Sequence, residues 1–285
     1  MTTLDSKQYK ETERQKWDSV ASGWQKWWRT IERGAGKLSN RLIELAEIKP
    51  GSKVLDISTG IGEPALTAAN RMGKTGYLLA TDISPQMLSI AKQRAISLDL
   101  SGMIEFKVGD TETIDLPSSA FDAALCRAGL MLLPDLRAGL LNIYRSLIKS
   151  GRFAAAVWSS PDKVPFISIV MNTIMREANV PSPPPGTPGP FSLSDENDLK
   201  NSFITSGFKD PTIERMIVSF DFESSRVFTN YVIETSGLFQ TILANQTHEK
   251  KEEILKAINE AAIEYADSTG KVTFDNETIL IVGKK

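Results

Sequence analysis

The chain of 285 residues contains one cysteine, Cys126, and one histidine, His248. A single cysteine excludes a disulfide within the chain, and we expect Cys126 to be a small core residue. No segment approaches the ~18 consecutive apolar residues of a transmembrane helix, so no stable membrane insertion is expected. No metal site is predicted.

An excess of charge of either sign is also lacking. Lysine and arginine together number 33, against 35 for aspartate and glutamate, which leaves a net charge of −2 and no basic block. A nucleic-acid partner is therefore not expected. Residues 1–14 are polar and charged where a secretory signal would be apolar, which predicts a cytoplasmic protein. The length suits one large domain with an elaboration.

A glycine-rich turn follows the first predicted strand. Val54 and Leu55 end an apolar strand, and Gly60 and Gly62 let a ligand approach the backbone without a Cβ atom in the way. Pro64 suits the first turn of the helix that must begin there, because the N–H that proline lacks would have no helical partner in any case. A ligand would lie over the N-terminus of this helix.

Two further acids follow the next two predicted strands. The strand at 77–80 leads to Asp82, after which Ser84 is predicted to be the N-cap of the next helix, and the strand at 104–108 is followed by Asp110. Asp82 is placed to accept hydrogen bonds from both ribose hydroxyls, and Asp110 to accept the adenine amino proton. Each has a local alternative: Asp82 as an acid that precedes a helix, and Asp110 with Thr111 as an ordinary turn. Together with the glycine turn, these acids indicate a nucleotide-type cofactor.

The glycine turn alone does not choose between such cofactors, because residues 60–65 also fit the G-x-G-x-x-A dinucleotide pattern. Asp56 favours S-adenosylmethionine. A dinucleotide places a pyrophosphate above this turn and would be repelled by Asp56, whereas the methionine moiety carries an ammonium and a sulfonium group. The alternatives are an NAD(P)-dependent oxidoreductase and a non-catalytic protein that binds the cofactor.

From Trp17 to about Phe208 the chain resembles the class I S-adenosylmethionine-dependent methyltransferases, and among them the menaquinone and ubiquinone C-methyltransferases. The resemblance rests on residues 54–69, 80–88, 109–112, 121–131 and 151–153. It implies an α/β fold with a doubly wound, Rossmann-like, seven-stranded sheet, N-terminal helices and a C-terminal helical insertion that forms a lid. The family usually has glycine at the position of Ser58, which leaves the backbone angle there open.

The resemblance also implies S-adenosyl-L-methionine as the cofactor. We expect it to contact residues that follow the first four strands: Asp56, Ser58, Thr59, Gly60, Gly62, Asp82, Ile83, Met87, Gly109, Asp110, Thr111 and Arg127. Arg127 has the alternative of pairing with Asp122 or Asp135.

The methyl acceptor is expected to be a small, apolar or aromatic molecule that is methylated on carbon or oxygen. The candidate substrate contacts are Trp24, Trp28, Met131 and Tyr231, and packing within the lid is the alternative for the tryptophans. Alignment of the acceptor with the sulfonium methyl supplies much of the rate, so a base is needed only for the acceptor proton. Weak candidates for that base are His248, Tyr231 and Glu234, with a solvated side chain as the alternative for His248.

Periodicity predicts the remaining elements, and the sequence leaves the oligomeric state open. We predict two helical pieces within 9–47, strands at 121–126, 153–158, 213–220 and 278–282, and helices at 134–147, at 195–206 and after Thr247. The proline-rich crossing at 181–190 suits neither helix nor central strand. The predicted domains are an N-terminal helical cap (1–48), a cofactor-binding core (49–180), and a region (181–285) that holds the crossing, the last two strands and a lid insertion (222–268).

Overall fold

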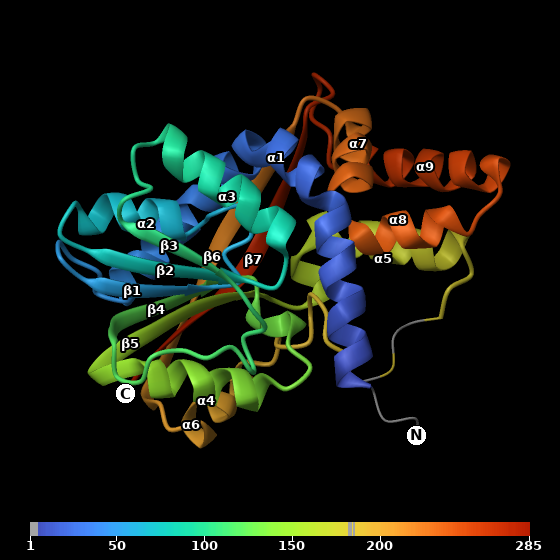
Figure 1. The fold of residues 1–285 in the computed structure, drawn as a ribbon. Helices are drawn as coiled ribbons and strands as arrows, with labels where there is room; N and C mark the ends of the chain where they lie inside the picture. Colours follow the sequence, from blue (N-terminus) through green and yellow to red (C-terminus); the bar gives the residue numbers. More distant parts are fainter. Residues whose placement is uncertain (1–4, 182–183, 185) are drawn as a thin grey trace. The chain divides into compact units, whose positions relative to one another are not determined.

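The strands of the protein form one sheet. The computed structural model describes residues 5–181, 184 and 186–285, so Ser182, Pro183 and Pro185 of the predicted crossing lie outside the described residues. Seven strands follow the order β3-β2-β1-β4-β5-β7-β6 (Figure 1). Their bounds are β1 (Lys53–Ile57), β2 (Tyr77–Asp82), β3 (Ile104–Val108), β4 (Phe121–Arg127), β5 (Leu147–Trp158), β6 (Lys209–Phe222) and β7 (Val272–Lys284).

Helices connect most of these strands. The α-helices are α1 (Ser6–Leu45), α2 (Ala65–Met72), α3 (Pro85–Ser97), α4 (Leu136–Ser146), α5 (Pro165–Glu177), α6 (Glu196–Thr205), α7 (Ser225–Thr235), α8 (Gly237–Ala244) and α9 (His248–Ile263). Two short 3-10 turns, η1 (Leu130–Leu132) and η2 (Pro161–Lys163), complete the order. Helices thus occur where the sequence predicted them after Asp195 and Thr247, within one or two residues at each end.

The sheet is doubly wound. Strands β1 to β5 pair in parallel, and β7 pairs antiparallel with β5. The predicted seven-stranded α/β fold is therefore confirmed. The strand order reverses between β1 and β4, and in such sheets the carboxyl ends of the strands at the reversal are where ligands bind. The residues that follow β1, β2 and β4 are therefore candidates for contact with a ligand.

The chain divides by compactness into two units. A helical unit comprises the described residues within 1–36, 160–187 and 217–277, and a sheet unit comprises residues 37–159, 188–216 and 278–285. Each unit is assembled from segments far apart in the sequence, whereas the predicted cap, core and lid were contiguous ranges. The lid function of residues 222–268 stays a prediction.

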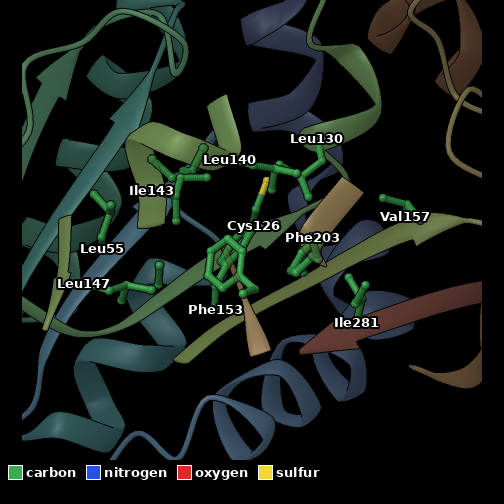
Figure 2. Packing of buried hydrophobic residues seen from close by; sticks show 14 of the residues in the cluster. Leu55, Cys126, Leu130, Leu140, Ile143, Leu147, Phe153, Val157, Phe203 and Ile281 are labelled. Carbon is green, nitrogen blue, oxygen red and sulfur yellow. The ribbon is translucent and has the colours of Figure 1, made fainter. Parts of the chain in front are cut away.

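The sheet unit has a three-layer arrangement. Helices α2 and α3 cover one face of the sheet, and α4 and α6 cover the other (Figure 1). Fully buried side chains fill the second of these interfaces, with Phe153 of β5 stacked on Phe203 of α6 at 5.4 Å between ring centroids. Cys126 lies in the same cluster with its sulfur toward Leu130 and Leu140 (Figure 2), so its predicted core role is confirmed.

An aromatic cluster organises the helical unit. The ring of Phe166, at the start of α5, lies 4.5–6.1 Å from five other rings, centroid to centroid. These rings come from β6, α7 and β7 and belong to Phe220, Phe222, Phe228, Tyr231 and Phe274. Asn276, which is fully buried, accepts a hydrogen bond from the Phe166 N–H and donates to the carbonyls of Val218 and Phe274. Its polar groups are thereby satisfied inside an otherwise apolar core.

The predicted break in the N-terminal helical region is wrong. One continuous helix of 40 residues, α1, replaces the two predicted pieces. Gly34 lies inside it, and a Cβ atom there would come within 2.4 Å of the Ser219 carbonyl oxygen. Glycine at this position therefore permits close packing of helix on strand and does not end the helix. None of the described helices, α1 included, is both long and apolar enough to cross a membrane.

Substitution of Gly34 tests this close approach. Alanine favours a helix over glycine by about 1 kcal/mol, but overpacking of a tight contact costs about 1–3 kcal/mol. We expect Gly34→Ala to lower the free energy of unfolding, measured by denaturant titration. Gly36→Ala is the matched control in the same helix, because a Cβ atom at Gly36 would meet nothing within 4 Å, and it should stabilise the protein. Equal effects of the two substitutions would contradict the packing role.

Candidate functional site

Three carboxylates lie at the same edge of the sheet. Asp56 is the next-to-last residue of β1, Asp82 ends β2, and Asp110 follows β3. The parallel register pairs Asp82 with Val108, so the chain after β3 passes directly beside the end of β2. The Gly109 N–H donates to the Asp82 carbonyl at 2.9 Å and fixes this neighbourhood. The ends of β2 and β3 therefore lie side by side.

Asp82 holds the glycine turn in place. Its Oδ2 accepts a hydrogen bond from the Gly60 N–H at 2.8 Å, and its Oδ1 accepts one from the Ser84 N–H at 2.9 Å. Ser84 in turn caps α3 as predicted, since its hydroxyl accepts from the Met87 N–H at 3.1 Å. One carboxylate therefore ties the turn after β1 to the start of α3.

Asp56 is fully buried beneath this turn. Its Oδ2 accepts a hydrogen bond from the Ala65 N–H at the start of α2, at 3.0 Å. Burial raises the pKa of Asp56 from 3.8 to about 7, because the charged form loses its hydration, and the Thr59 hydroxyl and the Arg127 guanidinium offset only part of this shift. At neutral pH the carboxyl is therefore divided between its neutral and charged forms.

Two buried oxygens in the turn lack partners among the described residues. Neither Asp56 Oδ1 nor Thr59 Oγ1 makes a hydrogen bond of acceptable geometry there, although the two groups are close enough for the hydroxyl to act on the pKa of the acid. Buried polar atoms are usually paired, and the Thr59 hydroxyl is the group that lowers the pKa of Asp56 most, so the two side chains act on each other beneath the turn. The turn is also open at Gly60, where a Cβ atom would meet nothing within 4 Å. These features fit a cationic ligand that lies over the turn.

The backbone at Ser58 adopts the left-handed conformation. Its φ is 55°, a region that non-glycine residues rarely occupy, and this settles the angle that the sequence left open. The Ser58 side chain lies against Gly129, after β4: a Cβ atom at Gly129 would come within 2.5 Å of Ser58 Cβ and 2.9 Å of Cys126 Sγ. The absence of a side chain at Gly129 thus makes room for the serine.

Asp110 stabilises its own turn. Its Oδ1 accepts from the Glu112 N–H at 3.0 Å, and its Oδ2 accepts from the Thr113 hydroxyl at 3.1 Å. These bonds are those of an ordinary turn, the alternative considered for this segment. Thr111 is buried, and a Cβ atom at Gly109 would clash with Ile114 at 2.4 Å. The adenine role of this segment stays a prediction.

Arg127 lies at the end of β4 and faces the same buried acid. Its guanidinium donates to the Ser39 hydroxyl at 2.9 Å and lowers the pKa of Asp56 by its charge. Asp122 instead accepts from the Lys53 N–H, and Asp135 caps α4. The sequence did not single out Ser39. The other two predicted contacts lie at the α3 end of this region: Ile83 is half-buried and Met87 is 2% exposed.

The substrate candidates belong to two different units. Met131 is part of the sheet-unit core. In the helical unit, the Trp24 indole donates to the Thr235 carbonyl at 3.0 Å, and the Arg29 guanidinium lies 4.6 Å from the Trp28 ring centroid. The Trp24 bond is one of packing within the helical unit, the alternative weighed for the tryptophans. Their substrate role stays a prediction.

Two of the three candidate bases, Tyr231 and Glu234, have environments that do not favour proton abstraction. Burial raises the pKa of Tyr231 to about 12, so its hydroxyl stays protonated at neutral pH. Burial acts to raise the pKa of Glu234, but hydrogen bonds from Lys26 and Trp27, each 2.6 Å long, outweigh it and hold the pKa below its ordinary value. His248 is exposed at the first position of α9. No base is therefore assigned.

The buried Asp56 predicts a characteristic pH dependence of stability. An acid whose pKa is higher in the folded than in the unfolded state stabilises the fold most at low pH, and this stabilisation is lost as pH rises to the folded pKa. With pKa values of 3.8 and about 7, wild type should lose stability relative to Asp56→Asn by up to about 1.4 kcal/mol per pH unit between about pH 5 and 7. Denaturant unfolding of both proteins across this range measures the difference, which should be constant above pH 8. A pH-independent difference would show that Asp56 is charged throughout.

The contact between Ser58 and Gly129 predicts a coupled pair of substitutions. Gly129→Ala should cost about 1–3 kcal/mol of unfolding free energy, because the new methyl group overlaps Ser58. In a Ser58→Gly background the cost should fall by about 0.5 kcal/mol or more, since only the Cys126 contact remains. Ser58→Gly alone should stabilise the turn, because it relieves the left-handed strain. Additive effects in this double-mutant cycle would contradict the contact.

Comparison with known proteins identifies the domain. The family model described as "Methyltransferase domain" matches residues 55–155. The ubiquinone/menaquinone biosynthesis C-methyltransferase UbiE of Pseudomonas savastanoi pv. phaseolicola is 32% identical over 119 residues, which are 42% of this chain and 46% of that protein. The chain thus spans about half the length of the curated relatives it matches.

Solved structures share the fold at low sequence identity. A phosphoethanolamine N-methyltransferase 2 from Haemonchus contortus, solved with S-adenosyl-L-methionine, has a TM-score of 0.53 and 18% identity over 86% of this chain and 51% of its own. The [4+2]-cyclase SpnF has a TM-score of 0.53 and 20% identity over 89% and 82%. Similarity at this level establishes the fold alone. With the family match it confirms the resemblance seen in the sequence: the chain contains a class I methyltransferase domain similar to that of the ubiquinone/menaquinone C-methyltransferases.

Proposed function

We propose that the protein is an S-adenosylmethionine-dependent methyltransferase that acts on a small molecule. The observation that carries the proposal is the buried acid beneath an open glycine turn. Asp56 is fully buried beneath the turn, the turn is open at Gly60, and Asp82 lies at the end of the neighbouring strand. Such a pair suits a ligand with a cationic amino-acid tail and a ribose.

Bound S-adenosylmethionine would supply an electrophilic methyl group on its sulfonium sulfur. The chain's own part is binding and alignment, which account for much of the rate of such a displacement. Asp56, Thr59 and Gly60 would hold the methionine moiety, and Asp82 would accept hydrogen bonds from the ribose hydroxyls. The remaining predicted contacts are Ser58, Gly62, Ile83, Met87, Gly109, Asp110, Thr111 and Arg127.

The acceptor is proposed from the relatives. Their names specify C-methylation in ubiquinone and menaquinone biosynthesis, which supports a quinone-type or aromatic acceptor methylated on carbon. The family match ends at residue 155, and all of α5, α7, α8 and α9 lies beyond it. Acceptor choice by a lid at 222–268, a cytoplasmic location and the lack of a nucleic-acid partner stay predictions.

Calorimetric titration tests the cofactor. The purified protein would be titrated in parallel with S-adenosylmethionine, S-adenosylhomocysteine and NAD. Micromolar binding of the first two without the third supports the proposal, and a screen of quinones and phenols by mass spectrometry would then identify the methylated product. Binding of NAD alone would overturn it in favour of an oxidoreductase.

Replacement of Asp82 tests the ribose contact. Asp82→Ala should weaken S-adenosylhomocysteine binding by about 1–3 kcal/mol, roughly 5- to 150-fold, because the ribose hydroxyls and the Gly60 N–H both lose an acceptor. The control is Asp115→Ala, a neighbouring acid with an exposed side chain, which should bind as wild type does. Unchanged affinity in a folded Asp82→Ala protein would contradict the assignment.

A further inference from the structure

A buried charged network lies behind the glycine turn. Arg94, on the last turn of α3, has a side chain only 12% exposed, and Glu63, at the end of the turn, is 8% exposed. Charged side chains are seldom buried to this extent unless they are paired. Neither residue lies at the end of a strand, where the predicted cofactor contacts collect.

The guanidinium of Arg94 contacts the turn at two points. Its Nη1 donates to the Ile61 carbonyl at 2.6 Å, and its Nη2 lies 3.3 Å from Glu63 Oε1. The other oxygen of Glu63 accepts from the Thr67 hydroxyl at 2.6 Å, on α2. The network therefore joins α3, the glycine turn and α2 through one planar group, a geometry that lysine cannot reproduce.

The contact with Ile61 fixes one peptide plane of the turn. The Ile61 carbonyl is held by Arg94, and the N–H of the same peptide, on Gly62, donates to the Thr59 carbonyl at 3.0 Å. The Glu63 N–H also donates to the Thr59 carbonyl, at 3.1 Å. With both ends held, this peptide cannot rotate without breaking a charge-assisted hydrogen bond. The orientation of Gly60 and Thr59 is set by the same constraint.

We propose that Arg94 is a positioning residue for cofactor binding, which it serves by locking the Ile61–Gly62 peptide while Glu63 neutralises its charge. This inference rests on the proposed function, since it concerns the same turn. Arg94 touches no reacting atom. Its effect is that the turn is already in its binding conformation before the ligand arrives, so that binding does not have to order it.

The test uses three variants of the full chain. Arg94→Lys keeps the charge with a single point of contact, Arg94→Gln removes the cation beside Glu63, and the double variant Arg94→Gln with Glu63→Gln removes both charges. Arg71→Lys, on the exposed end of α2, is the matched control. Thermal unfolding identifies any variant that fails to fold. If Arg94→Gln alone does not fold, the double variant can still be measured, because it leaves no uncompensated buried charge.

Two measurements decide the outcome. By amide hydrogen exchange, the Gly62 and Glu63 N–H groups should exchange about tenfold faster in the folded double variant than in wild type, with smaller changes in the core of the sheet. S-adenosylhomocysteine should bind the double variant about tenfold more weakly, with Arg94→Lys between the double variant and wild type. The Arg71→Lys control should match wild type in both.

The outcomes separate the two proposals. If wild type binds no S-adenosylhomocysteine, the proposed function fails, and unchanged exchange in the double variant overturns the role of Arg94 independently. If wild type binds and the folded double variant has unchanged exchange and affinity, only the role of Arg94 is overturned. Faster exchange with unchanged affinity also overturns it, because the network would then be structural.

Discussion

The hydrogen bond from the Ala65 N–H to the buried Asp56 carboxylate is the contact around which the site is built. It joins the end of β1 to the start of α2, and thereby closes the chain between them into the glycine turn. Asp82 then fixes the same turn from β2, and Arg94 fixes it from α3. Because every one of these partners is a side chain on a regular element, the loop between them inherits the rigidity of the sheet unit.

Tight packing restricts which residues fit in and beside the turn. Ser58 adopts a left-handed backbone conformation that glycine would adopt without strain. At position 129, any residue larger than glycine would clash with the Ser58 side chain. The two positions lie after neighbouring strands, β1 and β4, at the reversal of strand order. Strain of this kind persists only where surrounding contacts over-determine the backbone, which is common at ligand sites.

The features that sequence analysis predicted are local, and those that it missed depend on distant contacts. Patterns only a few residues long predict the glycine turn, the acids at the ends of three strands, the cap at Ser84 and the order of α and β elements. The close packing of α1 at Gly34 involves Ser219, and the hydrogen bond of Arg94 involves the carbonyl of Ile61, so neither contact can be predicted from neighbouring residues in the sequence. Asp110 hydrogen-bonds within its own turn, and its adenine role stays a prediction.

The buried acid also has a consequence for the stability of the fold. A carboxyl whose pKa is raised to about 7 by burial opposes folding at neutral pH, and replacing it by a neutral group would remove that penalty. A cationic ligand over the turn reverses the balance, because its charge favours the ionised carboxylate that burial alone disfavours. Ligand binding and proton release would then be coupled: each cation bound lowers the pKa of Asp56 and expels the remaining proton. Burial of Asp56 thus accounts both for the cost of its charged form at neutral pH and for the cationic ligand that the proposed function places over the turn.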